Sequence, residues 1–349
     1  CARDHFRWQD EYPAGLSTEQ GLQVRRFPAV TSTPRAERQA FERRILDGDR
    51  LSLAEQYRWM NDDVRMPELF HYLLDHADEY RALIFTPYLF WTAFACSQIA
   101  PDRSVLWTCL HDEPYAYLDI FQPMLTGVAG LWFQTDPEHD LAHRVVEQPA
   151  RHDVVGCGVP VPDAYDPERF RRRHGIDEPF ILYAGRREGA KNWDALLATY
   201  AAAVERRDLP LQLVTIGAGE VRPPESVADR VIDLGFLDAQ DRDDAFAAAD
   251  VYVQPSRYEA FSRTVMEAWL AGTLVIGNGA CAPVRWHCER SGAGLTYEDD
   301  LELEEALVFA AEEPKAAAAL AEPGREYVLE HYTWERVLDG IERTLGAWT

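Results

Sequence analysis

The sequence predicts an α/β protein that is built from two Rossmann-like domains. Two blocks of the chain, 80–135 and the part from 180 onward, alternate short apolar runs with stretches whose apolar residues keep helical spacing. Strands that alternate with helices form parallel sheets, because each helix returns the chain to the edge at which the next strand starts. The length of 349 residues is also enough for two domains, each with its own hydrophobic core.

The first block contains three apolar runs that are typical of buried strands: "ALIF" (82–85), "SVLWTCL" (104–110) and "GLWFQT" (130–135). The most apolar stretch of the chain, 82–100, contains Thr86 and Pro87, which suit an N-cap and a first-turn proline. It therefore favours a strand followed by a buried helix over a membrane span. Residues 15–80 are rich in Arg and Glu, and we expect them to form mostly helices outside this sheet.

The second block gives six strands and three helices. The expected strands are "FILYAG" (180–185), "LQLVTIG" (211–217), "VIDLGF" (231–236), "VYVQPS" (251–256), "TLVIGN" (273–278) and "GLTY" (294–297). The expected helices are "KNWDALLATYAAAVERR" (191–207), "QDRDDAFAAA" (240–249) and "SRTVMEAWLAG" (262–272). The segment 154–179 is rich in Gly, Pro and charge, which indicates a linker. We therefore expect domains at 1–158 and 159–332, with 333–349 returning to the first.

The composition is that of an acidic globular protein. A net charge of −24 argues against nucleic acid or anionic lipid as a default partner, because both are polyanions. A phosphate-binding site would then have to be a local cationic pocket. Only two of the 35 basic residues are lysines, Lys191 and Lys315. The six cysteines form no C-x-x-C pair, which favours reduced, buried thiols in a cytoplasmic protein.

Polar and charged residues follow several of the expected strands. The strand 104–110 is followed by His111, Asp112 and Glu113, and the strand 180–185 by Arg186, Arg187 and Lys191. The strand 211–217 ends in a turn with Gly217 and Gly219. The strand 251–256 is followed by Glu259 and by a helix from Ser262. In open α/β sheets, ligands bind beyond the carboxyl ends of the strands. Cationic side chains, glycine turns and a helix N-terminus together suit a diphosphate with a polar group attached.

Two glutamates, Glu259 and Glu267, lie eight positions apart in the stretch "RYEAFSRTVMEAW". Ser262 is a plausible N-cap, which places Glu259 before the helix and Glu267 inside it. Taken alone, the pair could be a charge near a cap and a solvated helix position. Arg186 and Lys191, earlier in the chain, favour a binding site instead.

Five segments together resemble a known family. They are "YAGRREGAKNWDALL", "TIGAG", "DLGFLDAQD", "PSRYEAFSRTVMEAWLAG" and the terminal "YTWERVLDGIERTL", with "TCLHDEPYAYL" similar to the histidine region of the family. The chain resembles the retaining, nucleotide-sugar-dependent glycosyltransferases of family 4, most strongly over 179–275. The resemblance implies a GT-B-type fold, in which two Rossmann-like domains face each other across a cleft. It also implies sugar transfer from a nucleotide-diphosphate sugar to an acceptor hydroxyl with retention of configuration, without a metal or another cofactor.

The resemblance also assigns roles to individual residues. Glu259 would lie by the donor sugar and Glu267 would take the ribose hydroxyls. The backbone N–H groups of Phe261, Ser262 and Arg263 would contact the sugar and the phosphate, and Arg186 and Lys191 would hold the diphosphate. Gly185 and Gly217 would belong to the donor-binding loops, and Phe236 and Leu237 would face the base. His111 would lie across the cleft near the acceptor. For His111, a buried structural histidine is an equally good interpretation. The acceptor would be a sugar, a lipid-linked molecule or a small molecule, with no nucleic acid and no transmembrane segment.

The N-terminal part of the sequence departs from the family. Its members begin with a strand and a glycine-rich loop, and neither has a counterpart here, so the first domain is expected to lack them. The loop 280–294 also differs from the glycine-proline-glutamate turn that is usual near the sugar. A non-catalytic module that binds a nucleotide sugar is therefore the alternative function.

Three other signals point to different chemistry. "GNGACA" (277–282) fits the dinucleotide fingerprint, but Pro283 stands where its helix should run. "HDLAH" (139–143) places two histidines one helical turn apart, with Asp140 in place of the glutamate base and no evident third ligand. Cys281 and Cys288, with His287 between them, have a spacing that suits no common zinc finger.

Overall fold

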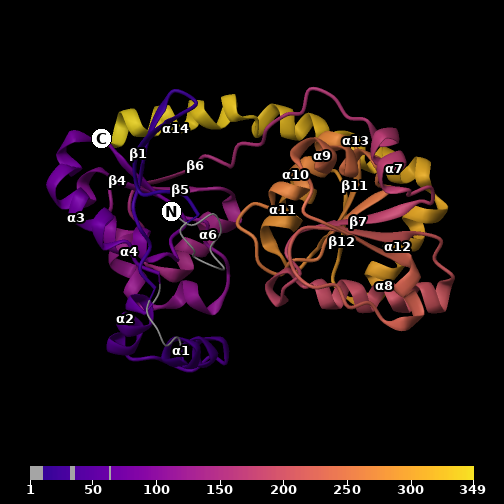
Figure 1. Cartoon of the computed structure of the whole chain (residues 1–349), viewed down its shortest axis with the longest axis horizontal. Coiled ribbons are helices and arrows are strands. Elements are labelled where there is room, and N and C mark those ends of the chain that lie inside the picture. The colour runs from indigo at the N-terminus through magenta and orange to yellow at the C-terminus, as the bar shows by residue number, and fades with distance from the viewer. Residues whose placement is uncertain (1–10, 32–35, 63) are drawn as a thin grey trace. The chain divides into compact units, whose positions relative to one another are not determined.

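The computed structural model describes residues 11–31, 36–62 and 64–349, and the chain divides into two compact units (Figure 1). Unit 1 contains Cys1–Val155 and Ile341–Thr349, and unit 2 contains Gly156–Gly340. The boundaries expected from the sequence were 158 and 332. The architecture of each unit is α/β, with a parallel sheet at its centre.

The sheet of unit 1 has four parallel strands in the order β3-β4-β5-β6. They are β3 (Leu83–Phe85), β4 (Ser104–Trp107), β5 (Gly130–Phe133) and β6 (His152–Val154), joined by α4 (Trp91–Cys96), α5 (Gln122–Gly127) and α6 (Asp136–Val145). The sequence predicted the first three strands. The edge strand β6 was missed, because its sequence "HDV" is polar at two of its three positions and therefore forms no apolar run.

The last helix, α14 (Trp334–Trp348), ends in unit 1. Trp132 on β5 donates its indole N–H to the Thr344 hydroxyl over 2.8 Å. A β-carbon at Gly130 would lie only 2.1 Å from the Trp348 ring, so a glycine is needed where this helix crosses the strand. The C-terminal residues are thereby fixed to the first sheet.

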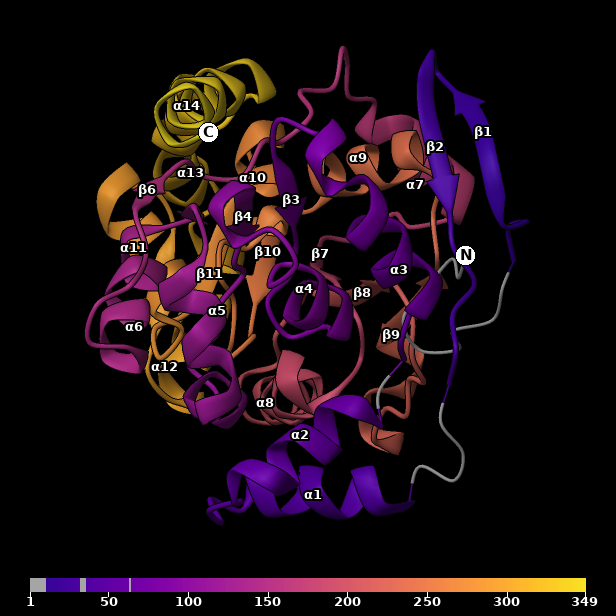
Figure 2. The same cartoon turned by 90° about the vertical axis from the view of Figure 1, so that its left-hand side faces the viewer.

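Residues 15–26 form an antiparallel hairpin, β1 (Gly15–Glu19) and β2 (Leu22–Arg26), whose two strands run side by side in Figure 2. The sequence interpretation of 15–80 as mostly helical is wrong for this part. Gln20 and Gly21 both have positive φ, at 50° and 82°, which suits a two-residue hairpin turn. The helices α1 (Ala36–Leu46), α2 (Leu53–Asn61) and α3 (Pro67–His76) follow.

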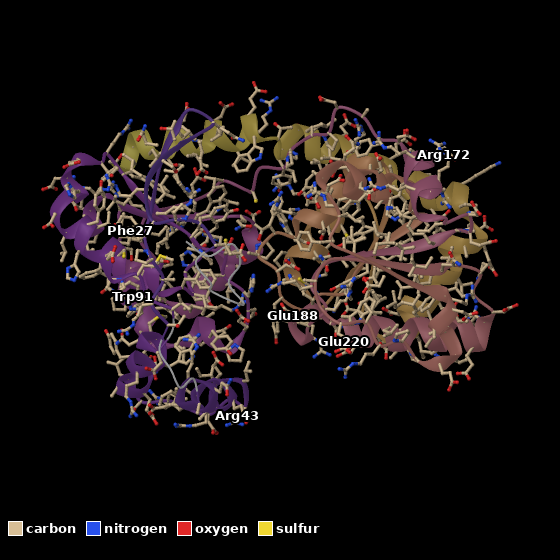
Figure 3. All side chains as sticks on the ribbon, viewed as in Figure 1. Phe27, Arg43, Trp91, Arg172, Glu188 and Glu220 are labelled. Carbon is tan, nitrogen blue, oxygen red and sulfur yellow. The ribbon has the colours of Figure 1, made fainter. Side chains whose placement is uncertain are left out.

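The apolar stretch 82–100 forms β3 and then α4, as the sequence predicts. Thr86 is not the N-cap, however: the helix begins at Trp91, after a cap at Phe90. The Trp91 side chain is labelled in Figure 3. None of the helices in the described part of the chain has the length and apolar character that crossing a bilayer requires.

The sheet of unit 2 has six parallel strands in the order β12-β11-β10-β7-β8-β9. They are β7 (Phe180–Ala184), β8 (Gln212–Ile216), β9 (Val231–Gly235), β10 (Val251–Gln254), β11 (Leu274–Asn278) and β12 (Leu295–Tyr297). All six were predicted. The chain winds outward from β7 in one direction and from β10 in the other, so the strand order reverses between these two. This is the doubly wound order of dinucleotide-binding folds.

Helices cover both faces of the second sheet. They are α7 (Pro167–His174), α8 (Trp193–Arg207), α9 (Ala239–Ala248), α10 (Arg263–Ala271), α11 (Ala282–Ser291), α12 (Asp300–Glu312) and α13 (Pro314–His331). Alternate residues of β7 enter different cores: Phe180 and Leu182 belong to one, and Ile181 and Tyr183 to the other. A strand buried on both faces gives the continuous apolar run that made it recognisable.

Short 3₁₀ helices connect several of these elements in the described part of the chain. They are η1 (Ala77–Glu79), η2 (Pro101–Arg103), η3 (Pro114–Tyr117), η4 (Asp119–Phe121), η5 (Gly189–Lys191) and η6 (Glu225–Arg230).

The segment 154–179 is not simply a linker, because it contains α7, which packs into unit 2. Phe170 is fully buried there. Arg169 donates to the buried carboxylate of Asp244 over 2.7 Å, and His174 lies 2.9 Å from Asp241. Two of the side chains in this charged segment, Arg169 and His174, are thus paired with acidic residues of α9.

Candidate functional site

A pocket of about 320 Å³ lies in unit 2 beyond the carboxyl ends of β7, β8 and β9 and beside the start of α10. It is lined by Ala184, Gly185, Arg186, Ile216, Gly217, Ala218, Phe236, Leu237, Arg242, Arg263, Thr264 and Glu267. Its charged residues are three arginines and one glutamate, a local excess of two positive charges (3 − 1) in a protein of net charge −24. The position is the one at which doubly wound sheets bind ligands.

Two glycines let the backbones of neighbouring strand ends meet at the pocket. Gly217 has φ of 125°, and a β-carbon there would lie 2.2 Å from the carbonyl oxygen of Gly185. The Gly185 N–H donates to Ile216 and the Gly217 N–H donates to Gly235, over 3.0 and 2.7 Å. The pocket wall at this point is therefore bare backbone, which a phosphate can approach closely.

An exposed aromatic side chain borders the same pocket. Phe236 follows β9 and is 87% exposed, which is unusual for phenylalanine. Gly235 before it adopts φ of 62°, and Leu237 after it also lines the pocket. Phe236 thus offers a free ring face to a planar ligand.

The start of α10 differs from the helix cap that the sequence suggested. Ser262 adopts φ of 69°, a left-handed conformation that costs a non-glycine residue roughly 1–2 kcal/mol. Its hydroxyl accepts a hydrogen bond from the buried Gln254 amide over 2.6 Å instead of capping the helix. The same amide donates to the Thr264 hydroxyl over 3.1 Å. Ser262 therefore leaves the first turn of α10 without a side-chain cap, beside the pocket.

Gln254 is a residue that the sequence analysis missed. It is the last residue of β10, and its only sequence signal is a polar side chain at the end of the apolar run "VYVQ". Because it holds both Ser262 and Thr264, it fixes the start of α10 relative to the sheet.

Glu267 lies in the second turn of α10, with a side chain only 10% exposed. Its Oε1 is 3.8 Å from Arg263 Nη2 and 3.9 Å from Arg242 Nη2. Burial raises the pKa of Glu267, and the two guanidinium groups oppose that rise. The carboxylate is thus close to two cations, at distances longer than a direct hydrogen bond. Arg242, on α9, was missed, since only the fold brings it to this helix.

Lys191 and Glu259 form a direct pair, with Nζ 2.6 Å from Oε1 and both side chains largely buried. The family resemblance assigns Lys191 to the diphosphate and Glu259 to the sugar. In the structure, these two side chains contact each other. Arg186 lines the pocket and lies 3.0 Å from Glu188. The neighbouring Arg187 is buried against Thr215, Gly217 and Asp233, so its role is structural.

The Phe261 side chain points into the core, so only its backbone is available to a ligand. Its ring meets His287 edge-on at 4.9 Å and Tyr332 at 4.9 Å. His287 is fully buried and contacts the Tyr327 hydroxyl at 2.8 Å. Burial lowers the pKa of His287 to about 3, so this residue is a neutral support for the loop before α10.

His111 lies in unit 1 and is not a core histidine, because its side chain is 33% exposed. Its Nδ1 is 3.5 Å from a Glu113 carboxylate oxygen. The predicted position of His111 across a cleft from the donor stays a prediction, as does the cleft itself.

A buried carboxylate, Glu138 on α6, holds the loop before His111. It accepts hydrogen bonds from the Thr108 hydroxyl, the Leu110 N–H and the Gln134 N–H, each over 2.6 Å. Burial raises its pKa to about 7, against the effect of these donors. The sequence analysis did not identify Glu138, although "TDPE" fits the T-x-x-E pattern of a helix start.

The rival signals have separate outcomes. After "GNGACA", α11 does begin at Ala282 with Pro283 in its first turn, so the proline does not interrupt a helix there. Cys281, His287 and Cys288 are all buried, and burial raises the pKa of both thiols to about 12, which disfavours the thiolate that metals bind. The histidines of "HDLAH" acquire a third neighbour, His152.

Similarity to proteins of known structure establishes the fold. The structure resembles sucrose-phosphate synthase from Thermosynechococcus elongatus with a TM-score of 0.73 and 18% identity, over 97% of this chain and 87% of that chain. It resembles HepE from Anabaena, solved in complex with UDP, with a TM-score of 0.68 and 15% identity, over 80% of this chain and 82% of that chain. The fold is that of the GT-B glycosyltransferases, as the sequence predicts.

Sequence comparison finds similarity to glycosyltransferases, mainly in the second unit. Residues 178–313 match the family described as Glycosyl transferases group 1. The chain is 31% identical over 234 residues to the D-inositol 3-phosphate glycosyltransferase of Saccharomonospora viridis, which is 59% of this chain and 53% of the relative. The chain thus spans about half the length of this curated relative. These matches confirm the resemblance to nucleotide-sugar glycosyltransferases.

Proposed function

We propose that the chain transfers a sugar from a nucleotide-diphosphate sugar to an acceptor hydroxyl, with retention of configuration and without a metal ion. The observation that carries this proposal is the pocket at the strand ends of unit 2. Six of the eight residues expected to bind the donor line it, namely Gly185, Gly217, Phe236, Leu237, Arg263 and Glu267, and so does Arg186.

The pocket offers complementary groups to each part of such a donor. The base would pack on the exposed ring of Phe236, and the ribose hydroxyls would donate to Glu267. The diphosphate would meet the bare backbone at Gly217, the start of α10 and the guanidinium of Arg186. Cationic side chains can neutralise the charge that develops on the leaving phosphate, so no metal is required for that step.

The transfer would proceed by attack on the same face that the phosphate leaves. The bond between the anomeric carbon and the phosphate oxygen breaks, the acceptor oxygen bonds to that carbon, and the acceptor proton passes to the departing phosphate oxygen. The pairing of Glu259 with Lys191 at 2.6 Å supports this route over a covalent intermediate on Glu259. A carboxylate held by a cation is a weaker nucleophile and is better placed to orient the sugar. His111 would act near the acceptor.

The test begins with the identity of the donor. A thermal-shift panel of nucleotide-diphosphate sugars selects the one that stabilises the full chain most. Release of free nucleotide is then measured with and without candidate acceptors, starting with phosphorylated cyclitols because of the relative named above. Nucleotide release that depends on the acceptor supports a transferase. Binding without any release supports the alternative, a non-catalytic module.

The double variant Arg186→Ala, Lys191→Ala should lower turnover by on the order of a thousandfold, because it removes charge stabilisation at the leaving group and the partner of Glu259. The matched control is Arg172→Ala, Lys315→Ala, which removes the same two kinds of charge from exposed positions. Circular dichroism checks that both variants keep the fold. Near-normal turnover in the first variant would contradict the assignment of the pocket.

A further inference from the structure

Two histidines on α6 face the same side of the helix. His139 and His143 are four residues apart, and this spacing places side chains one above the other on a helix. Their ring centroids are 4.7 Å apart. Both lie in unit 1, and neither lines the pocket of unit 2.

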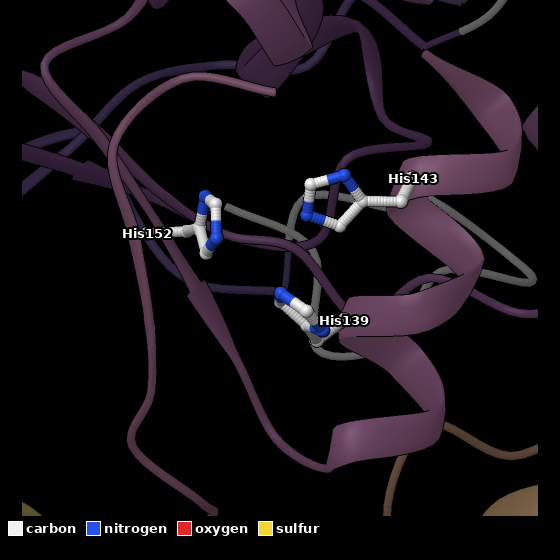
Figure 4. A group of neighbouring side chains, drawn as sticks. All are labelled: His139, His143 and His152. Carbon is white, nitrogen blue, oxygen red and sulfur yellow. The ribbon is translucent and has the colours of Figure 1, made fainter. Parts of the chain in front are cut away.

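A third histidine comes from the edge strand of the neighbouring sheet. His152 begins β6 and pairs in register with Leu131 on β5. Its ring centroid lies 5.0 Å from that of His139 and 5.3 Å from that of His143. One nitrogen of each ring faces a common space in Figure 4, and these three atoms lie within 4.8 Å of one another. The "HDLAH" helix therefore has the third residue that the sequence did not reveal.

The other nitrogen is already engaged in two of the three rings. His139 Nδ1 lies 3.1 Å from an Asp140 carboxylate oxygen, and His152 Nδ1 lies 2.8 Å from the carbonyl oxygen of Ala150. Because carboxylate and carbonyl oxygens only accept, each Nδ1 must donate, and in the neutral ring Nε2 then has the free lone pair that a metal needs. Metal-binding histidines show this arrangement, in which a carboxylate or carbonyl orients the ring from behind.

Two of the three histidine rings also pack against a buried phenylalanine. Phe133, fully buried at the end of β5, contacts His139 edge-on at 5.7 Å and His152 at 5.8 Å. His143 and His152 are exposed on their outer side, so an ion from solvent can reach them. In a tetrahedral zinc site the ligand nitrogens are about 3.3 Å apart, from Zn–N bonds of about 2.0–2.1 Å. Side-chain rotations that shorten the distances between the three nitrogens by about 1.5 Å or less would bring all three within bonding distance of one ion.

We propose that His139, His143 and His152 bind one divalent transition-metal ion, with zinc as the expected occupant. Three imidazole ligands and an open fourth position for water are a known zinc arrangement, and imidazole also suits nickel, copper and cobalt. The ion would join α6 to β6, the short edge strand of the first sheet. The proposal is independent of the sugar-transfer function, because it uses other residues in another unit.

The experiment uses the full chain without a polyhistidine tag, stripped with EDTA and dialysed. Zinc chloride is titrated by calorimetry, and cobalt chloride is titrated by visible absorption, which reports tetrahedral coordination directly. The wild type should bind one ion per chain. His143→Ala and His152→Ala should each weaken binding by at least about tenfold, because each removes one ligand. His71→Ala, at an exposed histidine of α3, is the matched control and should bind like the wild type.

Two results would overturn the proposal. One is a wild-type chain that takes up less than one ion or gives no tetrahedral cobalt spectrum. The other is equal affinity in His143→Ala, His152→Ala and His71→Ala. Circular dichroism of each variant before titration ensures that lost binding is not lost folding. If one variant unfolds, the other still decides, because each removes a single exposed ring.

Discussion

Each unit has a buried glutamate on a helix near the carboxyl ends of its strands, but the surroundings of the two carboxylates differ. In unit 1, Glu138 is 1% exposed and accepts three hydrogen bonds from the protein itself, at the ends of β4 and β5. In unit 2, Glu267 lies 3.8 and 3.9 Å from two arginines, and it lines a pocket of about 320 Å³. The first carboxylate has its hydrogen bonds within the protein, whereas the second has cations nearby and space in front of it.

This difference separates a structural carboxylate from one that can bind a ligand. A buried acceptor that the fold satisfies completely stabilises the loop around it, and removing it leaves several donors unpaired. A buried carboxylate whose partners are too far away for direct hydrogen bonds contributes less to the stability of the fold. Its replacement by a neutral group should therefore lower the free energy of unfolding only slightly and lower the affinity for the ligand more. Substitutions of the two glutamates test this comparison directly, and a substitution of the buried His287 tests how unit 2 responds to acid.

Glu138→Ala should have the largest effect. It leaves the Thr108 hydroxyl and the N–H groups of Leu110 and Gln134 unpaired in a buried place, which should cost about 3 kcal/mol or more in the free energy of unfolding. Urea unfolding measures the loss, and hydrogen exchange should locate it at the ends of β4 and β5. Glu147→Ala, an exposed position just after the same helix, should change little. Equal effects of the two substitutions would contradict the structural role of Glu138.

The buried His287 should make unit 2 less stable in acid. Its pKa is about 3 in the folded chain and about 6.5 when unfolded, so between these values only the unfolded chain binds the proton. The free energy of unfolding should therefore fall as the pH drops below about 6.5, by roughly 2 kcal/mol at pH 5. Urea unfolding at several pH values should show a shallower acid slope in His287→Phe than in the wild type. An unchanged slope would mean that His287 binds its proton equally well in the folded and the unfolded chain.

Glu267→Gln should have the smallest effect on stability, within about 0.5 kcal/mol, because it replaces a buried charge by a neutral group of the same shape. Its effect on the ligand should be larger: about tenfold weaker binding of the nucleotide selected by thermal shift, from the loss of a charged acceptor. Calorimetric titration measures the affinity, and Glu289→Gln on α11 is the exposed control. Unchanged affinity together with a large loss of stability would place Glu267 in the same class as Glu138.

Much of unit 2 was predictable because its signals are local. Strands covered on both faces, such as β7, β10 and β11, give continuous apolar runs, and the other three strands of this sheet alternate regularly with helices, so all six were predicted. Gly217 and Phe236 were named because the segments that contain them resemble those of the family, and both line the pocket. Unit 1 was harder: β1, β2 and β6 are mostly exposed or half-buried, and "HDV" of β6 is polar at two of its three positions. A pattern that depends on burial cannot indicate strands that are not buried.

The sequence by itself determined the alternation of strands and helices, the resemblance of the second unit to glycosyltransferases, and which residues lie at the carboxyl ends of strands. Only the tertiary structure decided which of these residues meet. It paired Lys191 with Glu259, brought Arg242 from α9 to Glu267, and placed His152 beside His139 and His143. The physical reason is that chain spacing fixes neighbours only within one helix or strand. Contacts between elements depend on how the strands are ordered and how the helices pack on them, which no local pattern records.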